Sequence, residues 1–166
     1  GGGVIYWAYN NNDKDAIQKL KKMGYLPSEA LAVALALKDE RIMNSLLKEG
    51  VEVTSDSIRA LIISPESLKD EKSKKLLKKL LPKVKNINQL DRSGWNLLDY
   101  AQNVETAQVL LDAGVKLRKH KDVLSHRLGL INMLQDIAKR KPSRDIKNDI
   151  KNRIELIEFY VKQGAD

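Results

Sequence analysis

The apolar residues of this chain recur three and four positions apart along most of its length, the spacing that places side chains on one face of an α-helix. Two such stripes are Ile17, Leu20 and Met23 in one segment, and Ile42, Leu46 and Leu47 in another. Short polar loops, glycines and prolines interrupt the pattern at intervals. The pattern predicts an all-α chain built from successive helix pairs.

The helices that we expect are Val4–Asn10, Lys14–Met23, residues 29–38, Asp39–Glu49, Ser55–Ile63, Glu66–Leu81, a short pair within 91–117, Asp122–Ala138 and Arg144–Gln163. Asp13 and Ser28 are expected N-caps, because a side-chain oxygen there can accept from a free backbone N–H. Segment 29–38 is so rich in Ala and Leu that we expect it to be buried on most sides. Trp7 lies in an apolar run, so we expect it in the core or against a repeat that this sequence lacks.

Glycine closes the second helix of four of the five pairs. The four endings read LKKMGYLP, LLKEGVEV, LLDAGVKL and YVKQGAD, and Pro82 stops the remaining pair. Glycine suits this position because it adopts a left-handed backbone without a steric penalty. A helical unit that ends in the same way several times indicates a repeat architecture.

Segment 91–117 resembles an ankyrin repeat. The family pattern runs Asp, two variable residues, Gly, one variable residue, Thr-Pro-Leu-His, one variable residue and Ala. This chain matches it with Asp91, Gly94, Leu98 and Ala101, followed by the LLxxG ending at 110–114. Residues 157–166 also resemble the family's LLxxGAD ending.

Two residues depart from the family's Thr-Pro-Leu-His. Asn96 stands in place of Thr and can still cap the helix through its side-chain oxygen. Asp99 stands in place of His and loses a donor that links neighbouring repeats, so we expect a less regular stack. A HEAT or TPR stack is the alternative, although the signal at Asp91 and Gly94 argues against both.

The resemblance implies an ankyrin-like α-α solenoid of about five helix pairs with few or short β-hairpin fingers, the best of them near 86–94. We expect one domain over 1–166, with units at about 4–27, 28–54, 55–88, 91–117 and 118–166. The glycine spacings differ from the family's period of about 33 residues, so the first two units are short and the last carries an insertion. The opening glycines and the final GAD suggest a fragment of a longer protein.

A protein of this family would act as a protein–protein interaction module. Its partner-binding residues would lie at the fingertips and the concave face: Arg92, Ser93, Trp95, Asn103, Lys116, Lys119 and His120. Trp95 has two open interpretations. It is either a binding anchor or a residue that packs against the third or fifth unit.

The net charge of +8 is concentrated in two segments, 69–85 and 116–151. In the first, leucines fall on one side of the predicted helix, and Lys72, Lys75 and Lys79 fall on the other. This basic patch is a solvated face, a docking site for an acidic protein surface, or a site for nucleic acid or anionic lipid. Nucleic acid is disfavoured because no aromatic residue lies among the lysines, and lipid because Trp and Phe are absent.

Catalytic and metal-binding motifs are not evident. The two histidines are six residues apart, cysteine is absent, and no phosphate-binding or nucleophile motif occurs. We therefore expect no enzymatic activity, cofactor, metal or small-molecule substrate. No apolar run approaches the roughly 20 residues that span a bilayer.

Two other roles remain open. The chain could be a regulatory or scaffolding domain of a larger enzyme. It could also be part of a secreted effector. Its composition is rich in Lys, Asn, Ile and Leu, as is common in proteins from AT-rich genomes, and its degenerate repeats resemble ankyrin stacks of effectors from intracellular bacteria and of viral host-range proteins. The absence of cysteine favours a reducing compartment, and we expect the cytoplasm or a host cytosol.

Overall fold

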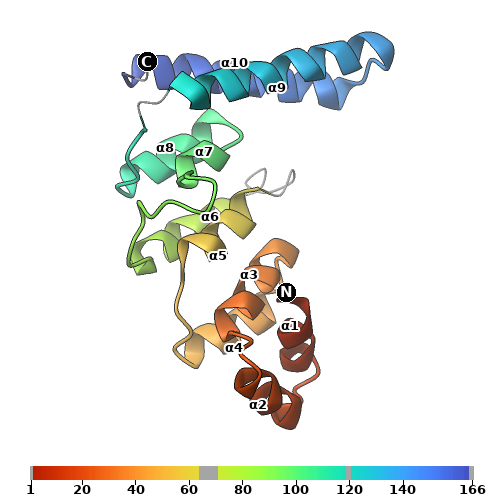
Figure 1. Cartoon of the computed structure of the whole chain (residues 1–166), viewed down its shortest axis with the longest axis vertical. Helices are drawn as coiled ribbons and strands as arrows, with labels where there is room; N and C mark the ends of the chain where they lie inside the picture. Colours follow the sequence, from red (N-terminus) through yellow and green to blue (C-terminus); the bar gives the residue numbers. More distant parts are fainter. Residues whose placement is uncertain (1, 64–70, 119–120, 165–166) are drawn as a thin grey trace. The chain divides into compact units, whose positions relative to one another are not determined.

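The computed structural model describes residues 2–63, 71–118 and 121–164. Within these ranges the chain forms ten α-helices and no strand, which confirms the all-α prediction (Figure 1). It divides into two compact units, Gly1–Gln89 and Leu90–Asp166, and we describe each by itself. The division falls between the third and fourth predicted repeats; the single repeat domain and its ankyrin-like arrangement stay predictions.

Unit 1 contains three helix pairs. Its helices are α1 (Gly3–Asn10), α2 (Lys14–Lys22), α3 (Pro27–Leu37), α4 (Glu40–Lys48), α5 (Ser55–Ile62) and α6 (Glu71–Leu80), followed by the 3₁₀ turn η1 (Leu81–Lys83). The last α-helix ends directly before the turn that contains Pro82, as expected. The predicted start at Glu66 lies outside the described residues.

Helix α3 is the centre of unit 1. It packs against α1, α4 and α5, which makes it the common neighbour of all three helix pairs. Ala30, Leu31, Ala34 and Leu35 are buried, because their small or branched side chains allow close packing on more than one side. The predicted burial of segment 29–38 is confirmed in part, because Ala36, Leu37 and Lys38 at its end are exposed.

Side-chain caps begin several helices of unit 1. Asp13 Oδ1 accepts from Ala16 N at 3.0 Å, which confirms the predicted cap. The prediction for Ser28 is wrong: the helix begins at Pro27, with Leu26 as the residue before it. Proline suits a first helical position because its φ is already helical and its missing N–H is not needed there.

Several apolar side chains of unit 1 are more exposed than predicted. Trp7 is 56% exposed and Met23 is 71% exposed, so neither belongs to the core; Leu47 is only partly buried. Helix α1 packs against α3 and α2 and buries Ile5, Ala8 and Tyr9, and Trp7 lies on another face of this short helix.

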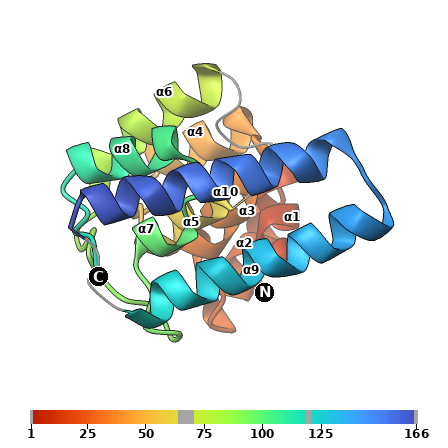
Figure 2. The ribbon, with the colours of Figure 1, turned by 90° about the horizontal axis from the view of Figure 1, so that it is seen from above.

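Unit 2 combines two short helices with a long helical hairpin. The short helices are α7 (Leu97–Tyr100) and α8 (Val104–Asp112), and the hairpin consists of α9 (Lys121–Arg140) and α10 (Arg144–Lys162) (Figure 2). Helix α10 packs against both α8 and α9. The hydrophobic core is Leu97, Leu98, Ala101, Ala107, Leu110, Val115, Ile131, Leu156 and Tyr160.

The glycines at helix ends have the expected backbone. Gly114 has a φ of +101° and Gly164 a φ of +98°, the left-handed region in which other residues are strained. The β-hairpin expected near 86–94 is not formed: this part of the described chain holds turns and no strand. A tight turn at 91–95 takes its place.

Candidate functional site

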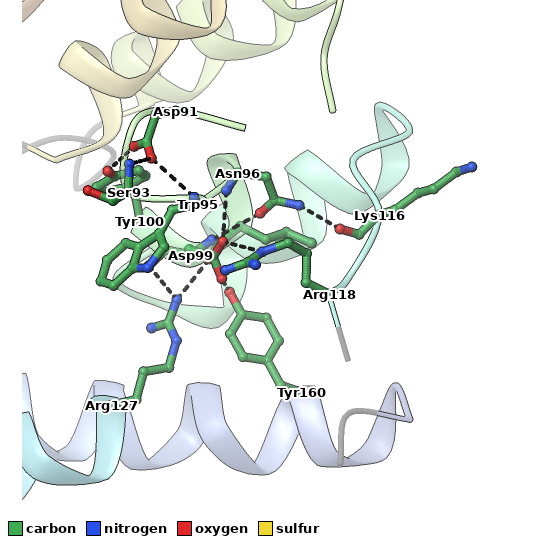
Figure 3. Close-up of polar contacts among 11 residues, drawn as sticks. Asp91, Ser93, Trp95, Asn96, Asp99, Tyr100, Lys116, Arg118, Arg127 and Tyr160 are labelled. Carbon is green, nitrogen blue, oxygen red and sulfur yellow. Dashed lines mark hydrogen bonds and ion pairs between the residues drawn. The ribbon is translucent and has the colours of Figure 1, made fainter. Parts of the chain in front are cut away.

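Asp91 organises the turn that precedes α7. Its Oδ1 accepts from Ser93 N at 2.8 Å and from Trp95 N at 3.1 Å, while its Oδ2 accepts from the hydroxyl of Tyr100 (Figure 3). The backbone adds two bonds, from Gly94 N to Asp91 O at 2.9 Å and from Asp91 N to Trp95 O at 2.8 Å. One carboxylate thus holds both ends of a five-residue turn.

Gly94 is required by the shape of this turn. Its φ is +78°, a conformation that a side chain would strain. The side chains of Arg92 and Ser93 are exposed, as predicted from their positions. The turn therefore presents two accessible polar side chains on a backbone whose conformation is already determined.

Trp95 is partly buried and packs against two rings. Its centroid lies 5.3 Å from that of Tyr100 and 5.1 Å from that of His126, in an edge-on arrangement with the latter. His126 belongs to α9, within the fifth predicted unit. Part of the Trp95 side chain therefore packs against that unit, as one of its two interpretations expected. The remaining surface of Trp95 lies beside the Asp91 turn.

Asn96 and Asp99 cap α7 reciprocally. Asn96 Oδ1 accepts from Asp99 N at 3.3 Å, and Asp99 Oδ2 accepts from Asn96 N at 2.7 Å, which confirms Asn96 as the cap. The same Oδ2 accepts from Arg118 Nε at 2.8 Å, and Asn96 Nδ2 donates to Lys116 O at 2.7 Å. An ion pair therefore connects Asp99 to the segment after α8, a link that sequence reasoning missed.

Arg127 is the second residue that sequence reasoning missed. It is only 6% exposed, and its guanidinium donates to the carbonyl oxygens of Leu98 (2.8 Å), Asp99 (2.7 Å) and Ala101 (3.3 Å). These carbonyls lie in and directly after the four-residue helix α7, and of the three only that of Leu98 also accepts a backbone N–H in the described structure, from Ala101. Burial lowers the pKa of Arg127. The signal was available, because Arg127 lies three residues after Leu124 and four before Ile131, within an apolar stripe.

Tyr160 completes this junction from α10. Its hydroxyl donates to Leu98 O at 2.7 Å, and its ring lies 5.0 Å from the Arg127 guanidinium, within cation–π distance. Burial raises the pKa of Tyr160. The long hairpin is therefore joined to α7 by polar contacts from both of its helices.

The remaining predicted partner-binding residues have different places. Asn103 caps α8, accepting from Thr106 N at 2.8 Å, and this structural role was not predicted. The side chain of Lys116 is exposed, while its carbonyl holds Asn96. Lys119 and His120 lie outside the described residues.

The basic patch of unit 1 has the predicted two-sided pattern. Leu77, Leu80 and Leu81 are buried, and Lys75 and Lys79 are exposed. Lys72 is also exposed, but its ammonium lies 3.4 Å from the carboxylate of Glu40. Lys78 and Lys83 are exposed as well and extend the patch beyond the predicted residues.

Two tyrosine–carboxylate pairs lie in unit 1. Tyr6 donates to Asp39 Oδ2 at 2.7 Å, a bond that raises the pKa of Tyr6 and lowers that of Asp39. Tyr9 donates to Glu49 Oε2 at 3.2 Å, and burial together with that carboxylate raises the pKa of Tyr9 to about 12. Both pairs connect α1 to the ends of α4, because Asp39 is its N-cap and Glu49 its C-cap.

The described residues contain no cluster of three or more histidine or carboxylate side chains arranged to hold a metal ion. Over the same part of the chain, no helix has the length and apolar character needed to cross a membrane. Comparison with protein-family models, with curated proteins and with solved structures returns no match for this chain.

Proposed function

We propose that this chain is a protein–protein interaction module and that the turn at 91–95 in unit 2 contacts the partner. The observation that carries the proposal is the preorganisation of that turn. Five hydrogen bonds centred on Asp91 hold a backbone from which Arg92 and Ser93 project into solvent.

Preorganisation favours binding because an ordered loop loses little conformational entropy when a partner docks. Arg and Trp are also the side chains that most often dominate binding energy at protein interfaces. Here Arg92 is exposed, and Trp95 packs against the rings of Tyr100 and His126. A partner would therefore meet a rigid turn flanked by an aromatic surface.

The resemblance of 91–117 to an ankyrin repeat supports the same function. In that family this turn and the residues beside it often contact partner proteins, and Arg92, Ser93 and Trp95 occupy its variable positions. On this basis we propose an ankyrin-like module in which Lys116 extends the same contact surface.

The test is site-specific photocrosslinking. A photoreactive residue at position 92 should crosslink to a partner protein, and an excess of unlabelled wild-type chain should suppress this crosslink. The same photoreactive residue in place of Arg140, which is exposed in α9, should give no such crosslink. The double variant R92A/S93A should compete poorly, because it removes both contacts and leaves Asp91 and Gly94 to form the turn. Equal competition by R92A/S93A and wild type would refute the proposed contact.

A further inference from the structure

Helix α6 presents a short row of positive charges on a fixed backbone. Lys75, Lys78 and Lys79 in α6 and Lys83 in η1 are exposed. The opposite side of the helix is held in unit 1 by buried Leu77 and other leucines. The row spans about 12 Å at the rise of an α-helix. We call these four lysines the α6 cationic face.

On both sides of this face along the chain, lysines form ion pairs with carboxylates of the same unit. Lys72 pairs with Glu40 at 3.4 Å, Lys74 with Glu71 at 3.6 Å, and Lys85 with Glu52 at 3.2 Å. By contrast, no ion pair joins the α6 cationic face to any residue that the structure describes. Along the chain, the four ammonium groups of the α6 cationic face therefore lie between lysines that form ion pairs with carboxylates.

We infer that the α6 cationic face binds a short acidic segment of a partner protein. The inference rests on the proposed protein-binding function for the class of partner, but it uses a different surface from the 91–95 turn. A few clustered carboxylates would match a row of this length and charge. Such contacts would speed association and confer salt sensitivity more than they would raise affinity.

The carboxylates on either side of the α6 cationic face argue against nucleic acid as its ligand. Duplex DNA carries a charge about every 1.7 Å along its axis, so its backbone would continue past the row towards Glu40, Glu52 and Glu71. Residues 71–89 also contain no aromatic side chain on which a base could stack. A short acidic segment avoids both problems because it can end where the flanking carboxylates begin.

The geometry argues against a lipid surface too. A helix that binds a membrane inserts its apolar face between lipids. The apolar face of α6 is already occupied, because Leu77 and Leu80 are buried within unit 1. Only the charged side is available to a ligand.

The test measures binding of a short synthetic peptide with a central cluster of glutamates, and of the same peptide with glutamines. The variant K75Q/K78Q/K79Q/K83Q should lose affinity for the acidic peptide by about tenfold at low salt, as expected for several weak exposed pairs. The matched control K14Q/K19Q/K21Q/K22Q removes the same charge from exposed positions of α2 and should change affinity by less than about twofold, because those lysines are elsewhere in the unit. Circular dichroism should show that both variants retain their helices.

Three outcomes would overturn the inference. The first is equal loss in the α2 control, which would mean that only net charge matters. The second is equal binding of the glutamine peptide. The third is tighter binding of a short DNA duplex, or of phosphatidylserine vesicles, than of the acidic peptide. The R92A/S93A variant should bind the acidic peptide like wild type, so failure at α6 and failure at the turn are distinguishable.

Discussion

Arg127 and Tyr160 bind the same backbone oxygen, the carbonyl of Leu98, from two different helices. Arg127 Nη2 donates from α9 at 2.8 Å, and the Tyr160 hydroxyl donates from α10 at 2.7 Å. Both side chains are buried, so these bonds form where water is largely excluded. The Leu98 carbonyl in the four-residue helix α7 is thus one point at which both helices of the long hairpin are joined to the rest of unit 2, in addition to the packing of α10 against α8.

Replacing Arg127 with methionine should destabilise unit 2. The variant keeps much of the side-chain volume but leaves the carbonyls of Asp99 and Ala101 without this donor. We expect the free energy of unfolding to fall by about 2 kcal/mol. The loss is limited because the buried Nε of Arg127 has no partner in the described structure and is removed as well.

The measurement is urea unfolding followed by the fluorescence of Trp95 in a Trp7→Phe background. Trp7 is exposed, so its replacement removes the signal of unit 1 without disturbing a core. R140M, on the exposed side of the same helix, should change stability by less than about 0.5 kcal/mol. Equal effects of R127M and R140M would show that the carbonyl contacts are unimportant.

Tyr160→Phe should cost about 1 kcal/mol, because it removes one hydrogen bond and retains the ring beside Arg127. The two side chains share an acceptor, so the effects of Y160F and R127M should not add. A double-mutant cycle should give a coupling of at least about 0.5 kcal/mol. Strict additivity would contradict a shared role at Leu98 O.

Two substitutions of Asp91 should separate the contributions that its two carboxylate oxygens make to stability. Asparagine keeps Oδ1 as acceptor for Ser93 N and Trp95 N but alters the contact with Tyr100. Alanine removes both, so D91A should cost about 1 to 2 kcal/mol and D91N clearly less. Unfolding monitored by Trp95 fluorescence would rank them, and an equal loss in both would assign the stabilisation to the charge or to the contact with Tyr100, not to the bonds that Oδ1 accepts.

Two glycines of unit 2 should respond to alanine in opposite directions. Gly94→Ala should destabilise by about 1 kcal/mol, because its φ of +78° disfavours a side chain. Gly129→Ala should stabilise by about 0.5 to 1 kcal/mol, because this residue lies within α9 and a Cβ there meets no atom within 4 Å. Thermal unfolding of both variants checks the sign, and a stabilising G94A would contradict the turn geometry.

Alkaline pH should destabilise unit 1 through Tyr9. Its pKa is raised to about 12 in the folded chain, above the ordinary value of about 10. The stabilisation that this represents is therefore fully present below pH 10 and is lost as the pH rises towards 12. In Tyr9→Phe the loss of stability over this range should shrink, as measured by urea unfolding at several pH values. An unchanged pH dependence would exclude Tyr9 as its source.

Local chemistry explains the features that could be predicted from sequence. Asp13 and Asn96 cap helices because each side-chain oxygen accepts from a backbone N–H only three residues further along the chain. The burial of α3 and the two-sided character of α6 follow from the spacing of their own apolar residues. The caps involve no distant segment, whereas the burial of α3 also requires the packing of α1, α4 and α5 around it.

The prediction of Ser28 as a cap and the placement of Trp7 in the core failed for two different reasons. Pro27 starts its helix two residues earlier than a cap at Ser28 would, because proline already has a helical φ. Trp7 lies in an apolar run, but the run is longer than one face of a helix, and Ile5, Ala8 and Tyr9 take the buried side. Periodicity identified the apolar run, but the choice of face depended on α3.

The positions and ends of the helices, and the glycines that close them, follow from residues close together in the chain. The polar junction of unit 2 does not. Arg127 and Leu98 are 29 residues apart, and Tyr160 and Leu98 are 62 apart. A buried arginine within an apolar stripe is tolerated where several carbonyl oxygens accept from it, and only the tertiary structure brings α9 to the carbonyls in and after α7.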